Sequence, residues 1–483
     1  MPICIYPIPD GEPLSDSLEL KIDGQPVPVH MATVSAIPYN RRWPGHQRTI
    51  DQAEEAYFAL CSADSAVSVE VSVKREFSEA VVRPLRAGVT PERNGRNIRF
   101  TLPSPGYYTL ELDGYHNALH IFIDPQNERQ PRPGNEVLRF EAGVHDIGIL
   151  RLCSNQTVQL DSGAIVYGCI HAENAENIEI IGRGILDNSR NTETILFQPE
   201  EQGSGMTAVK NCVREHTIKL TGCRNITVDG ITIRDSLLYN ITTYGCEYFT
   251  AENVKIIGCW RYNSDGIDLH NTCHARIYNC FVRSFDDSIC VKAFDSPIDL
   301  CDDITVERCV VWNDWDHALE IGAETSALEL KNIRFIDCDV IHSTCVVLSI
   351  CNVDRGHVHD VTYENICVEY DAHAPRPQIQ PDDDTPFSQS PDDCSMADLI
   401  NMTIFRHHEY SQEDRRGRIS DIRFSDISVI SPGAPLLSFT GYDREHMVSG
   451  VRIRGLTVNG TPVRSFDEVR FYKNDFCADI ELA

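Results

Sequence analysis

The sequence predicts an all-β protein in which a parallel β-solenoid follows a separate N-terminal β domain. Three observations predict this: strand-type alternation without helical periodicity, a repeat of nearly constant length in the later part of the chain, and a Pro-rich stretch ahead of that repeat. At 483 residues the chain is also too long for one compact core, so two domains or a repeat architecture are expected.

Residues 1–130 have the pattern of a β-sandwich. Short alternating runs such as Ser65–Ser72 (SAVSVEVS) and Tyr107–Asp113 (YYTLELD) lie between turns that contain Pro and Gly. The stretch Asp124–Glu136 (DPQNERQPRPGNE) is typical of a linker because it is rich in Pro and polar residues. We therefore expect an N-terminal domain at 1–130 and a second domain at 136–483.

The second domain is built on a recurring octet of the form apolar, any, apolar, any, small or polar, apolar, any, apolar. Its copies begin at Ile226, Phe249, Ala275, Ile304, Ile333, Val361, Ile422 and Val451. Successive copies start 23 to 29 residues apart, except for one interval of 61 residues. A period in the twenties with alternating apolar positions predicts stacked parallel strands about 4.8 Å apart.

Two positions within the octet indicate how each turn is made. The middle position holds Gly, Asn or Asp, which tolerate a left-handed backbone between two strands. These residues are Gly230, Asn253, Asn279, Asn365, Asp426 and Gly455. Another position holds Cys280, Cys309 and Cys338 on successive turns. Because each turn supplies one thiol, we expect an internal stack of small apolar side chains rather than a metal cluster.

The interval of 61 residues contains an insertion at about 371–400. This insertion is rich in Pro and Asp, with the run HAPRPQIQPDDDTPFSQSPDDC, and it has no strand pattern. Two interpretations remain open. It is either a tolerated surface loop or a rim over a cleft that limits the length of the substrate.

Charge and cysteine content restrict the partners and the compartment. The formal net charge of −29 argues against nucleic acid and against an anionic membrane surface. No stretch long enough to span a bilayer is free of charge, and the first twenty residues lack the pattern of a secretory leader. The 19 cysteines are an odd number without a CxxC pair, which favours reduced thiols. We expect a cytoplasmic protein without nucleic-acid or membrane partners, and leave a homo-oligomer open.

Three aspartates form the strongest candidate for a functional site. Asp265 and the pair Asp286 and Asp287 lie 21 positions apart in the stretch 263–292, so a solenoid places them on neighbouring turns. Two or three carboxylates that face one cleft suit glycosidic bond cleavage, since ionised neighbours raise the pKa of the carboxyl that must donate a proton. The alternative is that these residues only cap turns of the solenoid.

The chain from about 177 to 368 resembles the polygalacturonase family, glycoside hydrolase family 28. The resemblance rests on four segments in family order: Asn177–Asp187, Ser236–Thr242, Asn263–Gly266 (NSDG) and Asp286–Lys292 (DDSICVK). It implies a right-handed parallel β-helix that hydrolyses a carbohydrate with inversion, without a metal ion or an organic cofactor. The N-terminal β domain ahead of the helix also resembles the layout of the family 49 dextranases.

The resemblance implies roles for the site residues. Asp286 would be the general acid, while Asp265 and Asp287 would hold and activate the water. His317 would stand where the family has a Gly-His-Gly motif, and Lys292 follows the Asp pair as it does in the family. Asn263, which opens the NSDG motif, is expected to contact the substrate.

One departure from the family concerns the substrate. The Arg-Ile-Lys motif that grips a uronate carboxylate should fall near Val347–Cys351, where this chain has VLSIC. Arg261 or Arg355 would be needed to replace the missing cations. The substrate is therefore expected to differ from a standard polygalacturonate, and a neutral sugar is a serious alternative.

Further residues near the motifs are expected to contact sugar. Trp315, and beside it Trp260 and Trp312, could stack on sugar rings, although packing is an equal alternative. Glu320 and Glu324 on the following turn could accept hydrogen bonds from hydroxyl groups.

The combined hypothesis is an inverting glycoside hydrolase with a carbohydrate substrate. A cytoplasmic location would suit short imported oligosaccharides, and hence exo action or a closed cleft. Two rivals stay open. One is another β-helix chemistry (a polysaccharide lyase, an epimerase or a fructosyl transferase), and the other is a non-catalytic glycan-binding solenoid.

Overall fold

The structure is a computed structural model of the chain. It describes residues 3–36, 52–190, 215–371, 396–408 and 410–483, together with the short strands 197–199, 206–208, 378–379 and 388–389. These residues form strands, turns and short 3-10 helices, the latter at η2 (Leu85–Ala87) and η3 (Phe466–Glu468), and they contain no α-helix. Accordingly, none of the described elements is a helix that could cross a membrane.

The N-terminal strands form two sheets packed face to face. The five-stranded antiparallel sheet has the order β3 (Gln25–Val27), β2 (Leu18–Ile22), β6 (Val67–Val73), β9 (Asn97–Leu102) and β8 (Glu92–Asn94). The six-stranded sheet has the order β1 (Cys4–Ile5), β5 (Ala53–Ser62), β11 (Leu119–Asp124), β10 (Gly106–Leu112) and β7 (Ala80–Arg83), with β4 (His30–Ser35) paired to β5. Alternate residues of both sheets, such as Val69 and Ile121, share one buried core, which is the packing of a β-sandwich.

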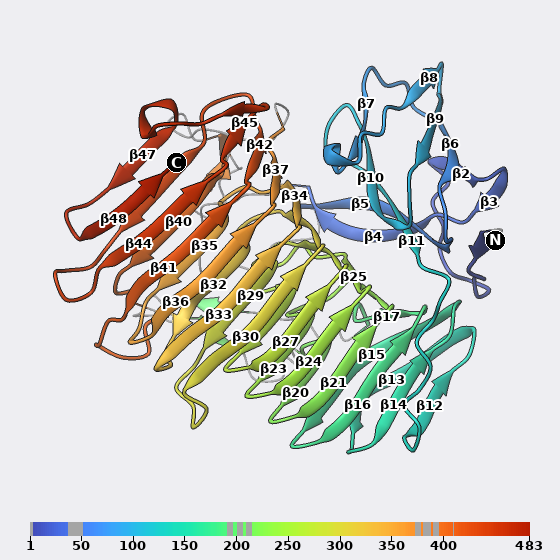
Figure 1. Cartoon of the computed structure of the whole chain (residues 1–483). Coiled ribbons are helices and arrows are strands. Elements are labelled where there is room, and N and C mark those ends of the chain that lie inside the picture. Colours follow the sequence, from blue (N-terminus) through green and yellow to red (C-terminus); the bar gives the residue numbers. More distant parts are fainter. Residues whose placement is uncertain are drawn as a thin grey trace.

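The later strands coil into a parallel β-helix, in which most turns contribute one strand to a twelve-stranded sheet and two strands to a second sheet (Figure 1). We call its twelve-stranded parallel sheet the outer sheet. Its strands are β12 (Glu136–Phe140), β14 (Gln156–Leu160), β16 (Glu176–Gly182), β21 (Arg224–Asp229), β24 (Glu247–Glu252), β27 (Cys273–Tyr278), β30 (Leu300–Glu307), β33 (Glu329–Ile336), β36 (His357–Glu364), β41 (Arg418–Ser425), β44 (Val448–Arg454) and β48 (Cys477–Leu482).

The other sheet of the helix has 21 strands and runs as two ladders from the long strands β13 (Gly143–Leu152) and β15 (Ala164–Glu173). The sandwich-facing ladder contains β17 (Ile185–Asp187), β22 (Thr232–Arg234), β25 (Lys255–Ile257), β28 (Phe281–Ser284), β31 (Val310–Asn313), β34 (Asp339–His342), β37 (Cys367–Glu369), β42 (Ser428–Ile430) and β45 (Thr457–Val458), which pairs with β46 (Thr461–Pro462). The site ladder contains β20 (Ile218–Thr221), β23 (Ile241–Tyr244), β26 (Ile267–His270), β29 (Ile289–Ala293), β32 (His317–Thr325), β35 (Val346–Asn352), β40 (Asp398–Ile404), β43 (Leu436–Thr440) and β47 (Arg470–Lys473).

These sheets confirm the predicted fold, a right-handed parallel β-helix preceded by an N-terminal β-sandwich. Two antiparallel hairpins, β18 (Phe197–Pro199) with β19 (Met206–Ala208) and β38 (Gln378–Ile379) with β39 (Ser388–Gln389), are the described strands outside these sheets. Most of the predicted insertion at 371–400 lies outside the described residues.

Inward apolar side chains of each turn stack on those of the next turn to form one long core. Cys280, Cys309 and Cys338 are fully buried within it, which confirms the predicted internal stack. All cysteines in the described part of the chain are free. The predicted left-handed turns are also confirmed, because Asn253 and Asn279 have φ values of 54° and 50°.

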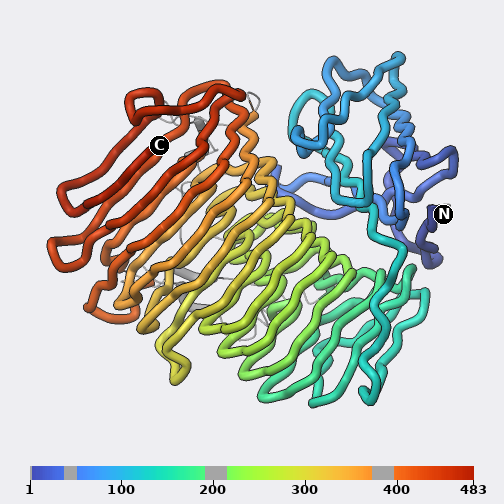
Figure 2. The backbone as a smooth tube through the Cα atoms, viewed as in Figure 1, coloured from blue at the N-terminus to red at the C-terminus, as the bar shows by residue number. Residues whose placement is uncertain are grey.

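The sandwich packs against the side of the helix rather than its end. Figure 2 shows the chain leaving the sandwich, entering the first turn and continuing turn by turn to the C-terminus at the far end. Apolar side chains of the sandwich-facing ladder point outward here, and Phe281 and Trp312 share one buried cluster with Phe58 and Phe122 of the sandwich. Trp312 is therefore a packing residue, with the guanidinium of Arg283 over its ring at 3.8 Å.

Buried ion pairs also link the sandwich to the helix. The Lys255 ammonium donates to both oxygens of Asp124, each at 2.9 Å. Arg83 donates to Glu111 at 2.9 Å and reaches across to Glu369 of the helix at 2.5 Å. Each of these charges has a close partner of opposite sign, as buried charges require.

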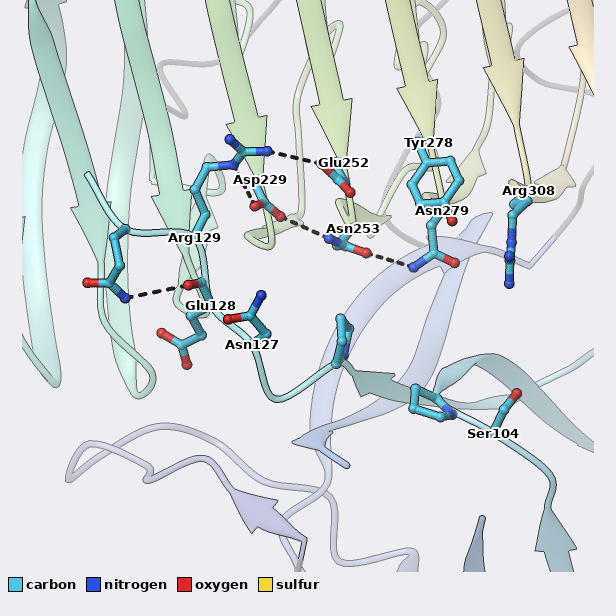
Figure 3. Close-up of a pocket in the computed structure, with 13 residues that line it drawn as sticks. Ser104, Asn127, Glu128, Arg129, Asp229, Glu252, Asn253, Tyr278, Asn279 and Arg308 are labelled. Atoms are coloured by element: carbon cyan, nitrogen blue, oxygen red, sulfur yellow. Dashed lines mark hydrogen bonds and ion pairs between the residues drawn. The ribbon is translucent and has the colours of Figure 1, made fainter. Parts of the chain in front are cut away.

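The linker between β11 and β12 runs along the edge of the outer sheet. Arg129 bonds to Asp229 at 2.9 Å and to Glu252 at 3.1 Å. Figure 3 shows these groups around a hollow of about 690 Å³ between the sandwich, the linker and the helix, where Asn279 donates to Asn253 at 2.7 Å. Two of its carboxylates, Asp229 and Glu252, are paired with Arg129, so we regard this hollow as part of the structural seam, our name for the whole interface between the sandwich and the helix.

Candidate active site

The three predicted aspartates lie at the start of adjacent strands of the site ladder. Asp265 precedes β26, and Asp286 and Asp287 precede β29, which pairs with β26 in parallel. The Gly266 amide donates to the Asp287 carbonyl at 2.8 Å. A Cβ atom at Gly266 would lie 2.2 Å from the Ser288 carbonyl oxygen, so the NSDG sequence needs Gly to bring the two turns this close.

Lys292 ties two of the aspartates together. Its ammonium lies 2.7 Å from Asp287 and 3.3 Å from Asp265, and Glu324 lies 4.0 Å away. Lys292 is almost fully buried. Burial lowers the pKa of this ammonium, but the carboxylates, with Asp287 first, raise it well above its usual value. Lys292 therefore stays charged and supplies a fixed positive charge to the floor of the site.

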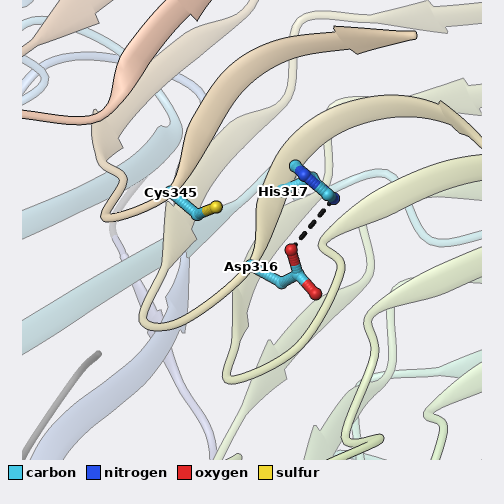
Figure 4. A group of neighbouring side chains, drawn as sticks. All are labelled: Asp316, His317 and Cys345. Atoms are coloured by element: carbon cyan, nitrogen blue, oxygen red, sulfur yellow. Dashed lines mark ion pairs between the residues drawn. The ribbon is translucent and has the colours of Figure 1, made fainter. Parts of the chain in front are cut away.

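His317 lies on the next strand, β32, with three carboxylates around its Nδ1 atom. The distances are 3.0 Å to Asp316, 3.0 Å to Glu320 and 3.3 Å to Asp287. Figure 4 shows His317 and Asp316 facing one another, with Cys345 nearby. Burial alone would lower the pKa of His317, but Asp316 and Glu320 raise it well above its usual value. His317 is therefore the second cation of the site.

The pKa values of the adjacent Asp286 and Asp287 are shifted in opposite directions. Burial, followed by the charges of Asp316 and Asp287, raises the pKa of Asp286 well above its usual range. Burial also acts to raise that of Asp287, but Lys292 and His317 overcome it and lower the pKa of this carboxyl. A carboxyl with a raised pKa thus lies beside one with a lowered pKa, which is the arrangement that acid–base chemistry needs.

Asp265 also has a raised pKa. The causes are burial and then the neighbouring charges of Asp268 and Asp286. One of its carboxyl oxygens, Oδ1, is buried without a hydrogen-bond partner among the described residues. A buried polar oxygen in that state is suited to accept a hydrogen bond from a water or a substrate hydroxyl.

These groups line a pocket of about 200 Å³. It is lined by Tyr239, Asn263, Asp265, Asp286, Asp287, Lys292, Trp315, Asp316, His317, Glu320, Ala323, Glu324, Cys351, Phe405, His407 and Tyr410. The structure therefore brings together the predicted Asp265, Asp286, Asp287, Asn263, Lys292, His317, Glu320 and Trp315. The Asn263 backbone amide donates to Asp286 at 2.7 Å, so this residue also positions the carboxyl group.

Arg261 and Arg355 do not line this pocket. The Arg261 guanidinium stacks on Trp260 at 4.6 Å, and Arg355 pairs with Asp299 and Glu413, each at 2.6 Å. Of the tryptophans, Trp315 reaches the pocket, but its ring packs on Phe285 and the residue is 8% exposed.

The sequence did not predict several residues that line the pocket. Phe405, His407 and Tyr410 follow β40 in a segment outside the octet repeat, so no periodic signal marks them. Tyr239 and Cys351 are indistinguishable from packing residues in the sequence. Asp316 sits directly before His317, and that adjacency was the one available signal.

Groups of donors that could hold a metal ion occur here, among them Asp287, His317 and Glu320. Their ligand atoms lie within 4.8 Å of one another. The Lys292 ammonium already lies 2.7 Å from Asp287, and His317 carries a raised pKa. Because protein cations occupy the space between these carboxylates, the donor set suits proton transfer better than metal binding.

Comparisons with known proteins show what the chain is similar to. Residues 146–375, slightly less than half of the chain and inclusive of all three aspartates, match the sequence profile of glycosyl hydrolases family 28. The chain is 21% identical over 319 residues to a dextranase of Arthrobacter sp. (strain CB-8), covering 57% of this chain and 45% of that protein. A dextranase of Arthrobacter globiformis matches at 21% over 312 residues, covering 54% of this chain and 44% of that protein.

Solved structures share the fold. Dex49A from Penicillium minioluteum aligns with a TM-score of 0.68 at 14% identity, covering 99% of this chain and 96% of that chain. The polygalacturonase from Erwinia carotovora aligns with a TM-score of 0.52 at 15% identity, covering 72% of this chain and 89% of that chain. At these identities the likeness shows the fold alone.

Together, the profile match and the relatives show that the chain is similar to glycoside hydrolases and shares a parallel β-helix fold with them. Its relatives lie in families 28 and 49, which confirms the resemblance predicted from the motifs. The chain spans about half the length of the curated dextranases that it matches, 45% and 44%.

Proposed function

We propose that the protein hydrolyses O-glycosidic bonds of a neutral glycan with inversion at the anomeric carbon. The observation that carries the proposal is the divergence of two adjacent buried carboxyls, with the pKa of Asp286 raised and that of Asp287 lowered. One protonated and one ionised carboxyl beside one pocket supply the acid and the base of a glycosidase.

In the proposed reaction Asp286 gives its proton to the leaving glycosidic oxygen as the bond to the anomeric carbon breaks. A water attacks that carbon from the opposite face, and its proton passes to Asp287. The unpartnered Oδ1 of Asp265 accepts the second hydrogen of this water and fixes its orientation. Lys292 keeps Asp287 ionised before the step. Solvent then returns the proton from Asp287 to Asp286.

The charge of the pocket supports a neutral sugar. Its carboxylic residues are Asp265, Asp286, Asp287, Asp316, Glu320 and Glu324, and its cations are Lys292 and His317, both already paired with these acids. A uronate carboxylate would find no unpaired cation among the described lining residues and would meet surplus negative charge. Strand β35, where the family has its Arg-Ile-Lys motif, contributes Cys351 instead.

Among neutral glycans we propose a dextran-like α-glucan. Two curated relatives are dextranases, and Dex49A aligns over nearly the whole chain. Charge-assisted hydrogen bonds that vicinal hydroxyls donate to the carboxylates suit glucose units, which carry only neutral polar groups.

The size of the pocket supports exo action. About 200 Å³ is below the roughly 300–1,000 Å³ of pockets that enclose a drug-sized ligand, and it corresponds to about one sugar ring. Phe405, His407 and Tyr410 line the same pocket as the aspartates. We propose that one terminal unit is released per event, and that the substrates are short oligosaccharides. The cytoplasmic location remains a prediction.

The test is incubation of the purified protein with glycans of matched length. The panel contains α-1,6-gluco-oligosaccharides, oligogalacturonides and neutral galacto- and fructo-oligosaccharides, and products are identified by mass and chromatography. We expect saturated products from the gluco-series, with monosaccharide first. An unsaturated product absorbing in the ultraviolet would indicate a lyase instead. Activity on oligogalacturonides alone would contradict the neutral substrate, and binding without turnover would indicate a glycan-binding solenoid.

A further inference from the structure

A second hollow lies on the site ladder, towards the N-terminal end of the helix. It has a volume of about 660 Å³, more than three times that of the catalytic pocket. Its polar lining comes from strands β13, β15 and β20 and the residues around them. These polar residues are Arg151, His171, Glu173, Glu215, Lys219 and Thr221. We call it the distal hollow.

The distal hollow and the catalytic pocket share one outward row of side chains. Arg151 pairs in register with His171, and His171 with Lys219. The row continues from Lys219 through Thr242, Asp268 and Cys290 to Glu320, which lines the catalytic pocket. Lys219 is thus two strand spacings and Arg151 four from the turn of Asp268, about 10 Å and about 19 Å. A sugar unit of an extended glycan is about as long as one spacing, so these side chains lie two to four units away.

Direct contacts connect the two hollows. His171, in the distal hollow, bonds through Nε2 to the His216 carbonyl at 3.0 Å. The His216 ring stacks on Tyr239 at 4.8 Å, and Tyr239 lines the catalytic pocket. The Lys219 ammonium lies 5.8 Å from the ring centroid of Tyr244 on the next strand. The floor between the two hollows is therefore continuous and partly aromatic, which suits sugar rings.

The distal hollow differs from the catalytic pocket in charge. Two cations, Arg151 and Lys219, and two carboxylates, Glu173 and Glu215, line it. Burial lowers the pKa of His171, which keeps its ring neutral near pH 7. A balanced set of strong donors and acceptors suits hydroxyl groups, whereas a polyanion would meet as much repulsion as attraction.

We propose that the distal hollow is a substrate subsite that holds the sugar units two to four positions from the cleaved bond. Arg151 and Lys219 donate hydrogen bonds to the hydroxyls of these units, and Glu173 and Glu215 accept hydrogen bonds from them. The proposal rests on the proposed function, because it assigns the distal part of the same glycan. It also explains how a pocket for one sugar selects oligosaccharides.

The experiment measures binding without turnover, by calorimetry. The parent protein carries Asp286→Asn, and the probes are α-1,6-linked glucose oligomers of two and of seven units. Lys219→Met and Arg151→Met are added singly to this parent. The matched control is Lys331→Met, an ion-paired lysine on the outer sheet, outside both hollows. We expect each distal variant to lose about 10-fold in affinity for the seven-unit glycan, while the two-unit glycan and the control change by less than about 2-fold.

Equal losses for both glycans, or unchanged affinity for the longer one, would overturn the distal subsite. Hydrolysis of the seven-unit glycan by the wild-type protein tests the proposed function separately. If the wild type hydrolyses this glycan but the distal variants bind it normally, the subsite alone is wrong. If the parent protein binds neither glycan, the substrate class and the subsite assigned to it are both wrong.

Discussion

Two buried glutamates, each beside a histidine, differ in the direction of their pKa shift. One lies at the interface between the two domains and the other in the candidate active site. Glu111 in the seam between sandwich and helix pairs with His342 and with Arg83 at 2.9 Å. Glu320 in the active site lies 3.0 Å from His317. Burial raises the pKa of both, yet His342 and Arg83 lower that of Glu111 to about 2. Burial and Asp287 raise that of Glu320 to about 8.

The difference is the number of carboxylates that share each cation. Arg83 and His342 together stabilise the ionised form of Glu111 in the seam. In the site, His317 is shared by Asp287, Asp316 and Glu320, so burial is not fully compensated. A surplus of buried acid costs stability and leaves protonated carboxyls ready to donate. That surplus distinguishes the catalytic cluster from the ion pairs that hold the domains together.

The largest expected effect is that of Asp286→Asn. Loss of the proton donor should lower kcat/KM by about 10²–10⁴-fold. The same change should increase the free energy of unfolding at pH 7, because the raised pKa of Asp286 means that its charged form is disfavoured in the folded protein. Steady-state kinetics and urea unfolding measure the two effects. A variant with normal activity would contradict the role of Asp286.

The substitution Arg83→Met in the seam should have the opposite effect on stability and lower the free energy of unfolding. Removing this cation leaves Glu111 and Glu369 buried with fewer partners, so we expect a loss of about 3–5 kcal/mol in the free energy of unfolding. The matched control is Arg96→Met, whose exposed pair with Glu76 should contribute about 1 kcal/mol or less. Equal effects from the two variants would contradict the structural role of the seam.

The paired variants Glu111→Gln and Glu320→Gln test the comparison itself. Glu111→Gln should lower the free energy of unfolding at pH 7, since a group with a lowered pKa stabilises the fold above its unfolded pKa. Glu320→Gln should leave it unchanged or raise it, since the pKa of about 8 keeps Glu320 largely protonated in the folded state. Thermal and urea unfolding of both variants measure the sign of each change in the free energy of unfolding. A lower free energy of unfolding for Glu320→Gln would contradict the difference between the two glutamates.

The sequence predicts the parallel β-helix and the cluster of aspartates because both follow from the period of the octet repeat. The octet fixes which side chains point inward, and the interval between Asp265 and Asp286 then places them on adjacent turns. Contacts made outside the repeat escape this reasoning. Phe405 and Tyr410 reach the pocket from a segment without octets. Arg261 stacks on Trp260 instead of facing the site, and no feature of the sequence signals which way its side chain turns.

Trp312 shows that packing between the domains also cannot be predicted from the repeat. Its outward position on the sandwich-facing ladder suggests a sugar platform when the helix is considered alone. The sandwich covers that face in the structure, and Trp312 is 1% exposed. A domain interface of this kind depends on tertiary contacts between segments more than a hundred residues apart, which a repeat pattern does not encode.

A smaller effect is expected in the pH profile of the wild type. The value of kcat/KM should fall as pH rises through the raised pKa of Asp286, because the acid must be protonated. On the acid side activity should persist below pH 5, since Asp287 keeps its charge through its lowered pKa. Initial rates in buffers of constant ionic strength measure both limbs. An alkaline limb that survives in Asp286→Asn would assign it to another group.

The most direct test of this mechanism is the configuration of the first product. Proton NMR follows the anomeric signals of an α-1,6-linked glucose oligomer during the first minutes after enzyme is added, before mutarotation mixes the anomers. Asp286 as acid with a water held by Asp265 and Asp287 predicts that the β-anomer appears first. A first product in the α-configuration would contradict direct attack by water and would require a covalent intermediate.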